Sequence, residues 1–461
     1  MIRDFVDRES ELRLLEEEWN KPGGRLIILY GRRRIGKTRL IGEFTRDKPG
    51  VLYFAEDTSP SLQMRQLQAA CAAFLNDSLL ATLEINSWEQ LFMYLAKHSP
   101  ASRGYLVIDE FTYLAKNDPT ILSALQKTWD TDLAGSPWCI ILCGSMLGLM
   151  SDLALSSTSP LYGRRTRDML LPALQFSDAR KFLSVPPIDA LKMYLSIGGI
   201  PEYLLKAGDY ETFSDFTARE FFDRYGYFYR EPYFILSQEF RELKMYQSIL
   251  QAIAFGNTTP APIAQFCGLD SRHLYPYLES MTRLGIIERE LPVLVTTKKG
   301  VYRIKERLFD FWYSFVFPHR QAIELNVVSI PHEQFDPYFG RQFEVFVRHE
   351  VIPRLFPAST IGRWWYGEEE IDIVGYDNHS ATILFGECKW GVLTRKESRK
   401  ILTSLQNKSS HVRHARYPEE KFLIVARTIE GKEALIKEGY LVLDLDDVLT
   451  VMDNTPPRPA A

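Results

Sequence analysis

One short stretch carries the residue types that bind the phosphate chain of a nucleotide. Gly31 and Gly36 are followed by Lys37 and Thr38, in the pattern GxxxxGK[ST] of a phosphate-binding loop. Glycines allow backbone N–H groups to approach phosphate closely. The lysine is placed to reach the β- and γ-phosphates, and the threonine hydroxyl to bind Mg²⁺. The stretch therefore predicts a site for a nucleoside triphosphate and Mg²⁺.

The elements around this loop are those that such a loop needs. An apolar run over residues 26–30 predicts a buried strand that ends at the first glycine. A helix beginning near Lys37 adds its positive N-terminal end. The other residues in and just after the loop also lie within reach of a nucleotide: Arg32, Arg33, Arg34, Ile35 and Arg39. The three loop arginines could contact phosphate or a partner, but solvated spacers are the better interpretation of them.

A second apolar run, over residues 104–108, ends in two carboxylates, Asp109 and Glu110. After a phosphate-binding loop this is the Walker B arrangement. Asp109 would hold Mg²⁺, and Glu110 would act as the general base that polarises the attacking water. The alternative is an acidic pair that caps the next helix.

A third apolar run, over residues 138–143, is followed by Ser145, which is placed to sense the γ-phosphate or the attacking water. A serine that caps the next helix is an equally good interpretation. Arg164 and, second, Arg165 precede another apolar segment and could act as an arginine finger, in cis or in a neighbouring subunit. A surface salt bridge is at least as good an explanation of either arginine.

The C-terminal third contains a second set of chemical residues. Glu387 and Lys389 lie two apart on a predicted strand and so face the same side. A hairpin would bring Asp372 beside them, and Glu344 on a preceding helix could supply a further ligand. Two carboxylates and a lysine suit a Mg²⁺ site for phosphodiester hydrolysis, with the lysine positioning the water. The alternatives are an ordinary set of cross-strand ion pairs or a nuclease-like site that is inactive.

Composition limits the classes of protein that need to be considered. The chain has 461 residues, of which 46% are hydrophobic and 25% charged, with a net charge of −4. This is typical of a soluble globular protein of about two to four domains, and the charge does not indicate a nucleic-acid binder, although a local basic face stays open. Five scattered cysteines without a CxxC pair fit the reducing cytoplasm. No apolar run is long enough to span a bilayer.

The middle of the chain predicts a winged helix-turn-helix. Helical patterns over residues 246–254, 261–268 and 272–284 are followed by two alternating segments that suit a hairpin. In a DNA reader the third helix enters the major groove. The basic and imidazole side chains available for this are few, so DNA contact and an intramolecular brace are equally good interpretations: Arg272, His273, Arg283, Lys298 and Lys299.

Taken together, residues 31–38, 109–111, 144–145, 160–164 and 198–201 resemble the archaeal-type ATPase family, a branch of the AAA+/STAND P-loop ATPases. The resemblance implies ATP binding and hydrolysis, a five-stranded parallel sheet, a helical lid and a winged helix.

The last third resembles the restriction-endonuclease-like PD-(D/E)xK superfamily, although Glu370-Ile371 stands before Asp372 where the superfamily name has proline. The expected α/β architecture is then a P-loop ATPase core (1–175), a helical lid (176–235), a winged helix-turn-helix (236–320), a restriction-endonuclease-like domain (321–453) and a disordered tail (454–461).

Two functions follow from these patterns. The first is a cytoplasmic, Mg²⁺-dependent ATPase whose nucleotide state controls the winged helix and a nuclease-like domain acting on DNA or another nucleic acid. The second is a non-catalytic regulator, in which ATP controls self-assembly or binding to DNA or protein and the nuclease fold is inactive. A homo-oligomer is possible in both, and neither involves a membrane. A small-molecule kinase is disfavoured because Glu110 suits hydrolysis.

Overall fold

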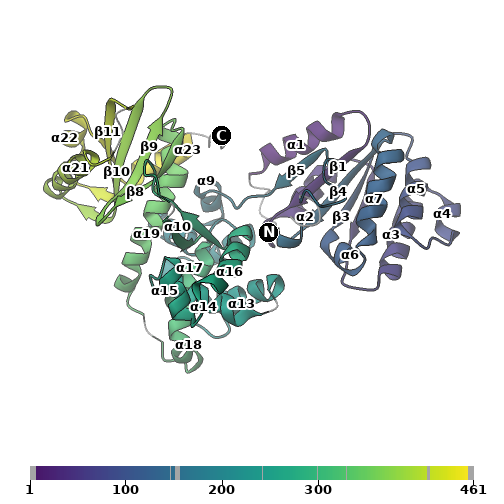
Figure 1. Cartoon of the computed structure of the whole chain (residues 1–461), viewed down its shortest axis with the longest axis horizontal. Coiled ribbons are helices and arrows are strands. Elements are labelled where there is room, and N and C mark those ends of the chain that lie inside the picture. Colours follow the sequence, from purple (N-terminus) through teal and green to yellow (C-terminus); the bar gives the residue numbers. More distant parts are fainter. Residues whose placement is uncertain are drawn as a thin grey trace. The chain divides into compact units, whose positions relative to one another are not determined.

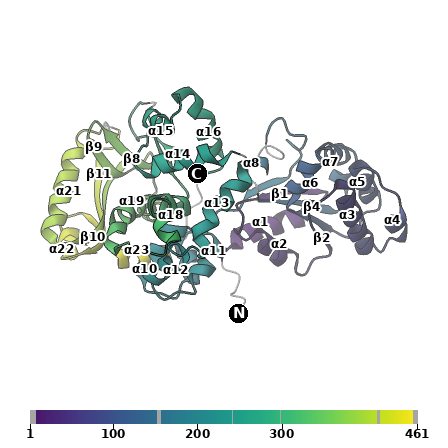
Figure 2. The same cartoon turned by 90° about the horizontal axis from the view of Figure 1, so that it is seen from below.

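The structure is a computed structural model that describes residues 7–145, 147–150, 156–240, 242–297, 299–328, 330–412 and 416–454 (Figures 1 and 2). Lys298 and the predicted tail beyond Asn454 lie outside these ranges. Internal contacts divide the chain into two compact units, Met1–Ala173 with Ile200–Glu202, and Leu174–Gly199 with Tyr203–Ala461. Among the helices described, none combines the length and apolar character needed to cross a membrane.

The first unit is built on a five-stranded sheet in the order β2-β3-β4-β1-β5. All its neighbouring strands pair in parallel, which confirms the parallel sheet expected from the sequence. Because the strands are parallel, the residues that follow β1, β3 and β4 meet at one edge of the sheet. The strands are β1 (Arg25–Tyr30), β2 (Gly50–Phe54), β3 (Gly104–Asp109), β4 (Trp138–Gly144) and β5 (Arg167–Leu170).

Helices cover both faces of this sheet. Alternate strand residues such as Leu26 and Ile108 pack with α3, α5, α6 and α7 in one large apolar core, while α1 and α2 lie on the other face (Figure 2). This arrangement explains why the strands read as continuous apolar runs, since both sides are buried. The helices are α1 (Glu9–Asn20), α2 (Lys37–Thr45), α3 (Pro60–Leu75), α4 (Ser78–Thr82), α5 (Trp88–Lys97), α6 (Phe111–Asn117), α7 (Thr120–Thr131), η1 (Leu133–Gly135) and α8 (Leu147–Met150).

The second unit begins with short helices. The helix α10 ends where Gly198 takes a φ of 73°, and α11 starts at Pro201, so the Gly-Gly-x-Pro sequence interrupts the helical run as expected. Aromatic residues dominate this part, with Phe221 packing on Phe228 and Phe311. The elements are α9 (Phe176–Ala179), η3 (Arg180–Phe182), α10 (Pro187–Ile197), α11 (Pro201–Ala207), α12 (Phe213–Glu220) and α13 (Tyr227–Glu239).

Three helices and a two-stranded antiparallel hairpin follow. Asp270 caps the third helix by accepting a hydrogen bond from the N–H of Arg272. The hairpin pairs Ile287 with Ile304 and Glu290 with Val301. The elements are α14 (Leu243–Ala254), α15 (Pro260–Cys267), α16 (Ser271–Arg283), β6 (Ile287–Glu290) and β7 (Val301–Ile304), after which come α17 (Arg307–Phe311), the π-helix η4 (Trp312–Val316) and α18 (Phe317–Glu324).

The C-terminal part holds a mixed sheet in the order β12-β11-β10-β9-β8. The strands β8, β9 and β10 are antiparallel, whereas β10, β11 and β12 run parallel. The predicted helix, strands and hairpin over residues 339–426 are present, whereas α22, β12 and α23 were not expected. The elements are η5 (His332–Phe335), α19 (Asp336–Phe346), η6 (Val347–Val351), α20 (Ile352–Leu355), β8 (Thr360–Tyr366), β9 (Glu369–Asp377), β10 (Thr382–Leu393), α21 (Arg395–Ser409), β11 (Glu419–Ile429), α22 (Lys432–Lys437), β12 (Leu441–Leu443) and α23 (Leu445–Asn454).

Candidate functional site

The phosphate-binding loop connects β1 directly to α2. Gly36 takes a φ of 96°, in the left-handed region that favours glycine. At Gly31 the chain passes close to the next strand, because a Cβ there would lie only 2.9 Å from the carbonyl oxygen of Leu171. Each glycine is therefore required by the path of the backbone in this loop.

Lys37 lies buried inside this loop. Its Nζ donates hydrogen bonds of 2.9 Å to the carbonyl oxygens of Gly31 and Arg32. Burial lowers the pKa of the Lys37 ammonium. A buried cation held by two loop carbonyls is suited to exchange them for phosphate oxygens.

The other loop residues have different surroundings. Arg33 donates to the hydroxyl of Tyr113 at 2.9 Å, and Arg34 pairs with Glu202 at 3.3 Å. Ile35 is buried, whereas Arg39 is exposed on α2. The two arginine partners belong to the first unit, so these side chains are engaged with the protein.

The Walker B carboxylates meet the loop at the edge of the sheet. Thr38 donates its hydroxyl to Asp109 at 2.7 Å, so the two residues predicted to hold Mg²⁺ are already in contact. Ser145 donates its hydroxyl to Glu110 at 2.8 Å. A continuous polar chain therefore runs from the phosphate-binding loop to the predicted general base and to the predicted sensor.

The two candidate finger arginines form ion pairs within the first unit. Arg164 makes a two-pronged contact with Asp130, at 2.8 Å from Nε to Oδ1 and 2.7 Å from Nη2 to Oδ2. Arg165 pairs with Asp168 at 3.2 Å. The salt-bridge alternative is the arrangement that the structure contains, and a finger role would require Arg164 to leave Asp130.

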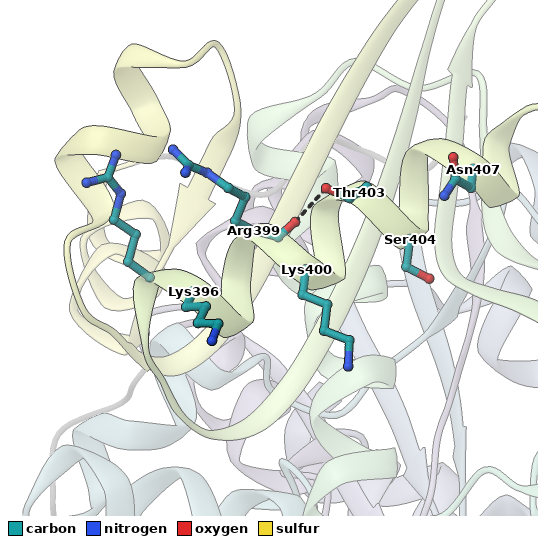
Figure 3. Close-up of a pocket in the computed structure, with 7 residues that line it drawn as sticks. Lys396, Arg399, Lys400, Thr403, Ser404 and Asn407 are labelled. Carbon is teal, nitrogen blue, oxygen red and sulfur yellow. Dashed lines mark hydrogen bonds between the residues drawn. The ribbon is translucent and has the colours of Figure 1, made fainter.

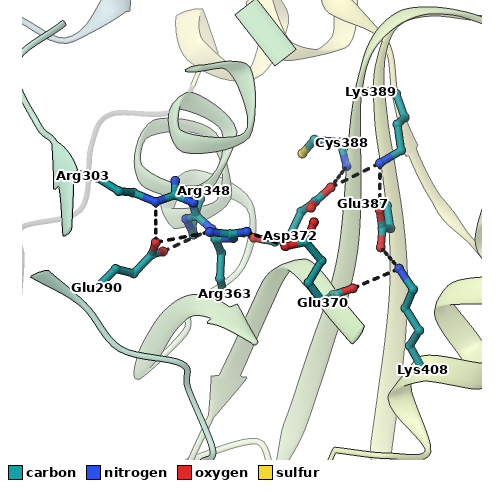
Figure 4. A network of polar contacts seen from close by, with 10 residues as sticks. All are labelled: Glu290, Arg303, Arg348, Arg363, Glu370, Asp372, Glu387, Cys388, Lys389 and Lys408. Carbon is teal, nitrogen blue, oxygen red and sulfur yellow. Dashed lines mark hydrogen bonds and ion pairs between the residues drawn. The ribbon is translucent and has the colours of Figure 1, made fainter. Parts of the chain in front are cut away.

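In the C-terminal sheet, the β9–β10 hairpin brings the predicted nuclease-like residues together (Figure 4). Lys389 Nζ lies 2.9 Å from Glu387 and 3.6 Å from Asp372. The backbone N–H of Cys388 donates to Asp372 at 2.9 Å. Burial, followed by the charge of Glu387, raises the pKa of Asp372. The spacing D-x14-E-x-K thus corresponds to one cluster of side chains.

Glu344 is also part of this neighbourhood, because burial and then the charge of Asp372 raise its pKa. Nevertheless, the described residues contain no cluster of three or more His, Cys, Asp or Glu side chains that could hold a metal ion. Asp372, Glu387 and Glu344 therefore do not form a three-carboxylate cage in this structure.

A second lysine completes the cluster, and the sequence analysis missed it. Lys408, near the end of α21, donates to Glu387 at 2.9 Å and to the carbonyl oxygen of Glu370 at 2.9 Å. Burial raises the pKa of Glu387, but Lys389 and Lys408 outweigh burial and lower it. No local spacing links Lys408 to the strand, so only the packing of α21 on the sheet reveals it.

Glu290, on β6, faces three arginines beside this cluster (Figure 4). Arg303 lies at 2.9 Å, Arg363 at 3.5 Å and Arg348 at 3.7 Å from its carboxylate. Arg348 is 1% exposed and donates to the carbonyl oxygen of Asp372 at 2.7 Å. Arg348 stands four residues after Glu344 on one helical segment, so helical spacing could have found it.

The loop between β6 and β7 packs on the C-terminal sheet. Its Val293, Leu294 and Val295 contact the apolar core around Trp364. The N–H of Val293 donates to the carbonyl oxygen of Arg363 at 2.9 Å. These contacts join the three-helix module to the sheet that carries Asp372.

Comparison with known proteins finds one family match in the N-terminal part of the chain and another in the C-terminal part. The family described as "ATPase domain predominantly from Archaea" matches residues 5–207, and the family described as "Archaea bacterial proteins of unknown function" matches residues 312–401. An uncharacterized protein of Methanocaldococcus jannaschii is 32% identical over 456 residues, which cover 96% of this chain and 99% of that protein.

Two further proteins match in part. An uncharacterized ATP-binding protein of the same organism is 57% identical over 44 residues, 10% of this chain and 75% of that protein. The solved Walker-type ATPase of Pyrococcus abyssi has 23% identity and a TM-score of 0.53, covering 68% of this chain and 97% of that chain. At this identity the likeness concerns the α/β fold with its parallel sheet.

Proposed function

The chain belongs to the family of archaeal-type proteins in which an ATPase domain precedes a C-terminal domain of unknown function, and we propose that it is an ATP-hydrolysing switch. From the cluster of Asp372, Glu387 and Lys389 we infer that this switch controls a nuclease-like domain that acts on nucleic acid. The observation that carries the ATPase half is the polar chain from Thr38 through Asp109 to Glu110 and Ser145. The proposed parts are an ATPase core (1–175), a helical lid (176–235), a winged helix (236–320) and a nuclease-like domain (321–453).

The donor groups at the loop fit ATP and Mg²⁺. Among the described residues, the hydrogen bonds of the Lys37 ammonium go to two backbone carbonyls of the loop, and these are replaceable by phosphate oxygens. Thr38 and Asp109 would hold Mg²⁺, which when bound neutralises charge on the β- and γ-phosphates. Glu110 accepts the proton of the attacking water, and the hydroxyl of Ser145 holds that carboxylate in place.

The ATPase half is tested by Glu110→Gln and Lys37→Ala. Glu110→Gln should bind ATP as wild type does but turn it over at least about 100-fold more slowly, since general-base catalysis contributes that much. Lys37→Ala should lose ATP binding. Glu89→Gln is the matched control, because Glu89 pairs with the exposed Lys127 on the surface. Wild-type turnover by Glu110→Gln would refute the assignment of the base.

The nuclease half is supported by the order helix, antiparallel β-hairpin, helix and parallel strand around Asp372, Glu387 and Lys389. Carboxylate oxygens of Asp372 and Glu387 fit Mg²⁺, which commonly takes one or two carboxylates and keeps several waters. When bound, Mg²⁺ polarises a phosphodiester. Lys389 would position the attacking water, and Glu344 would supply a further acceptor.

The nuclease half is tested by incubating the protein with DNA or RNA, Mg²⁺ or Mn²⁺, with and without ATP. Cleavage that depends on ATP and is lost in Lys389→Ala supports the proposal, and cleavage that Lys389→Ala does not change refutes it. Lys421→Ala is the control, because Lys421 belongs to the same sheet but pairs with the exposed Glu419.

The second candidate is a non-catalytic regulator with an inactive nuclease fold. Its support is that Glu387 already has two ammonium partners, Lys389 and Lys408, which neutralise it without a metal. ATP-dependent, salt-sensitive DNA binding without cleavage would favour this candidate.

The winged-helix module would act here as a brace. The loop that corresponds to the wing packs on the C-terminal sheet through Val293 and its neighbours. Arg272 on the third helix is exposed but pairs with Asp270. These contacts favour the bracing interpretation over insertion of the module into a DNA groove.

A further inference from the structure

The exposed face of α21 is a basic, hydrogen-bonding strip (Figure 3). Its side chains line an open groove of about 780 Å³, and none of them is apolar. They come from successive turns of one helix, at the spacing that puts them on a single face. The strip consists of Arg395, Lys396, Arg399, Lys400, Thr403, Ser404 and Asn407.

The positive charge of this strip is only partly neutralised. Arg395 and Arg399 share the single carboxylate of Glu438. The side chains of Lys396 and Lys400 have no hydrogen bond or ion pair with any described residue. Two unpaired ammonium groups thus stand one helical turn apart on the same face.

Packing and capping hold the helix that carries the strip in place. Leu402 and Leu405, on the opposite side of α21, are fully buried against the sheet. Thr394 and Glu397 form a reciprocal capping box at the start of the helix, which also occupies the Glu397 carboxylate. At the other end Lys408 is held by Glu387. The strip therefore keeps its shape before a partner arrives.

We infer that this face of α21 binds the phosphate backbone of a nucleic-acid strand. Lysine, arginine, hydroxyl and amide side chains are the groups that contact phosphate oxygens. From Lys396 to Asn407 the helix rises about 16 Å, which spans several phosphates of a strand. The absence of apolar side chains from this face disfavours a lipid or an apolar peptide as partner. Because phosphate contacts carry no sequence information, the binding is non-specific.

The inference rests on the proposed nuclease-like domain and gives it a substrate surface. The last turn of the helix that carries the strip contains Lys408, which contacts Glu387 of the candidate site. A nucleic-acid strand bound to this face of α21 would accordingly lie next to the residues proposed to cut it.

The experiment measures binding of a fluorescent duplex of random sequence to the full chain by anisotropy, in EDTA, at several salt concentrations. Lys396→Ala/Lys400→Ala should bind at least about tenfold more weakly at 0.1 M salt, and its slope of log K against log salt should be smaller by about 2. The matched control is Lys97→Ala/Lys127→Ala, which removes the same charge from α5 and α7 of the other unit.

Three outcomes would overturn the inference: no binding by wild type, unchanged affinity and slope in the strip variant, or an equal loss in the control variant. Competition by polyglutamate as strong as by unlabelled DNA would instead identify an acidic protein as the partner. Because EDTA removes divalent ions, these results do not depend on cleavage. Lys389→Ala abolishing cleavage while keeping binding would separate the strip from the candidate site.

Discussion

Removing the Glu290 carboxylate should loosen the backbone at Asp372. In Glu290→Ala the three arginines around it lose their shared counter-charge. Arg348 is affected most, because it is 1% exposed and, among the described residues, keeps one hydrogen bond, to the carbonyl oxygen of Asp372. The strand β9 would then be held by an uncompensated buried cation.

The size of the effect follows from burial and distance. Breaking a buried ion pair by removing one partner costs about 3–5 kcal/mol. The Arg348–Glu290 distance is 3.7 Å and Arg303 is partly exposed, so both contacts are weaker than an ideal buried pair. We therefore expect Glu290→Ala to lose about 3 kcal/mol of local stability, the lower end of this range. This corresponds to about 100-fold more frequent local opening, since each 1.4 kcal/mol is a factor of ten.

Amide hydrogen exchange read by mass spectrometry measures this opening segment by segment. Peptides from β8 and β9 should exchange about 100-fold faster in Glu290→Ala, whereas peptides from β1 and β3 should not change, because the contacts of Glu290 lie in the second unit. Arg303→Ala is the control for burial. It should lower the stability by about 1 kcal/mol or less, because Arg303 is the most exposed of the three arginines around Glu290.

Unchanged exchange of β9 in Glu290→Ala would refute the reasoning, because it would mean that solvent or Asp372 alone compensates Arg348. An equal effect of Arg303→Ala would also refute it, because the energetic contribution of each arginine would then not depend on how deeply it is buried.

Three further predictions concern single contacts. Lys408→Met leaves the buried Glu387 with one ammonium partner and should cost about 2 kcal/mol, seen as faster hydrogen exchange in β10. Burial raises the pKa of Glu18, but hydrogen bonds from cationic neighbours lower it to about 2. Its stabilisation is therefore present above pH 4.5 and lost toward pH 2, so Glu18→Gln should lower the Tm at pH 7 by about 2–4 °C and leave it unchanged near pH 2. If Arg164 is a finger, Arg164→Ala should slow ATP turnover by about 1,000-fold, whereas Asp130→Asn, which breaks the same ion pair, should not.

The sequence was most informative where function depends on neighbouring residues. Gly31, Gly36 and Lys37 act through backbone conformation and a single loop, so their spacing predicted the strand–loop–helix that the structure contains. The hairpin that joins Asp372 to Glu387 was predictable for the same reason, since two adjacent strands and a short turn bring them together.

Residues far apart in the chain could not be assigned in this way. The contact of Lys408 with Glu387 depends on how α21 packs across two strands, and the arginines around Glu290 come from β7, β8 and η6. The packing of the β6–β7 loop on the C-terminal sheet likewise has no local pattern.

The sequence by itself therefore determined the phosphate-binding loop and the grouping of Asp372 with Glu387 and Lys389, because each motif is a short-range constraint on backbone and side-chain type. Only the tertiary structure decided which charges compensate one another. Burial removes water from Glu387 and Arg348, and a buried charge must find its partner wherever the fold brings one within reach.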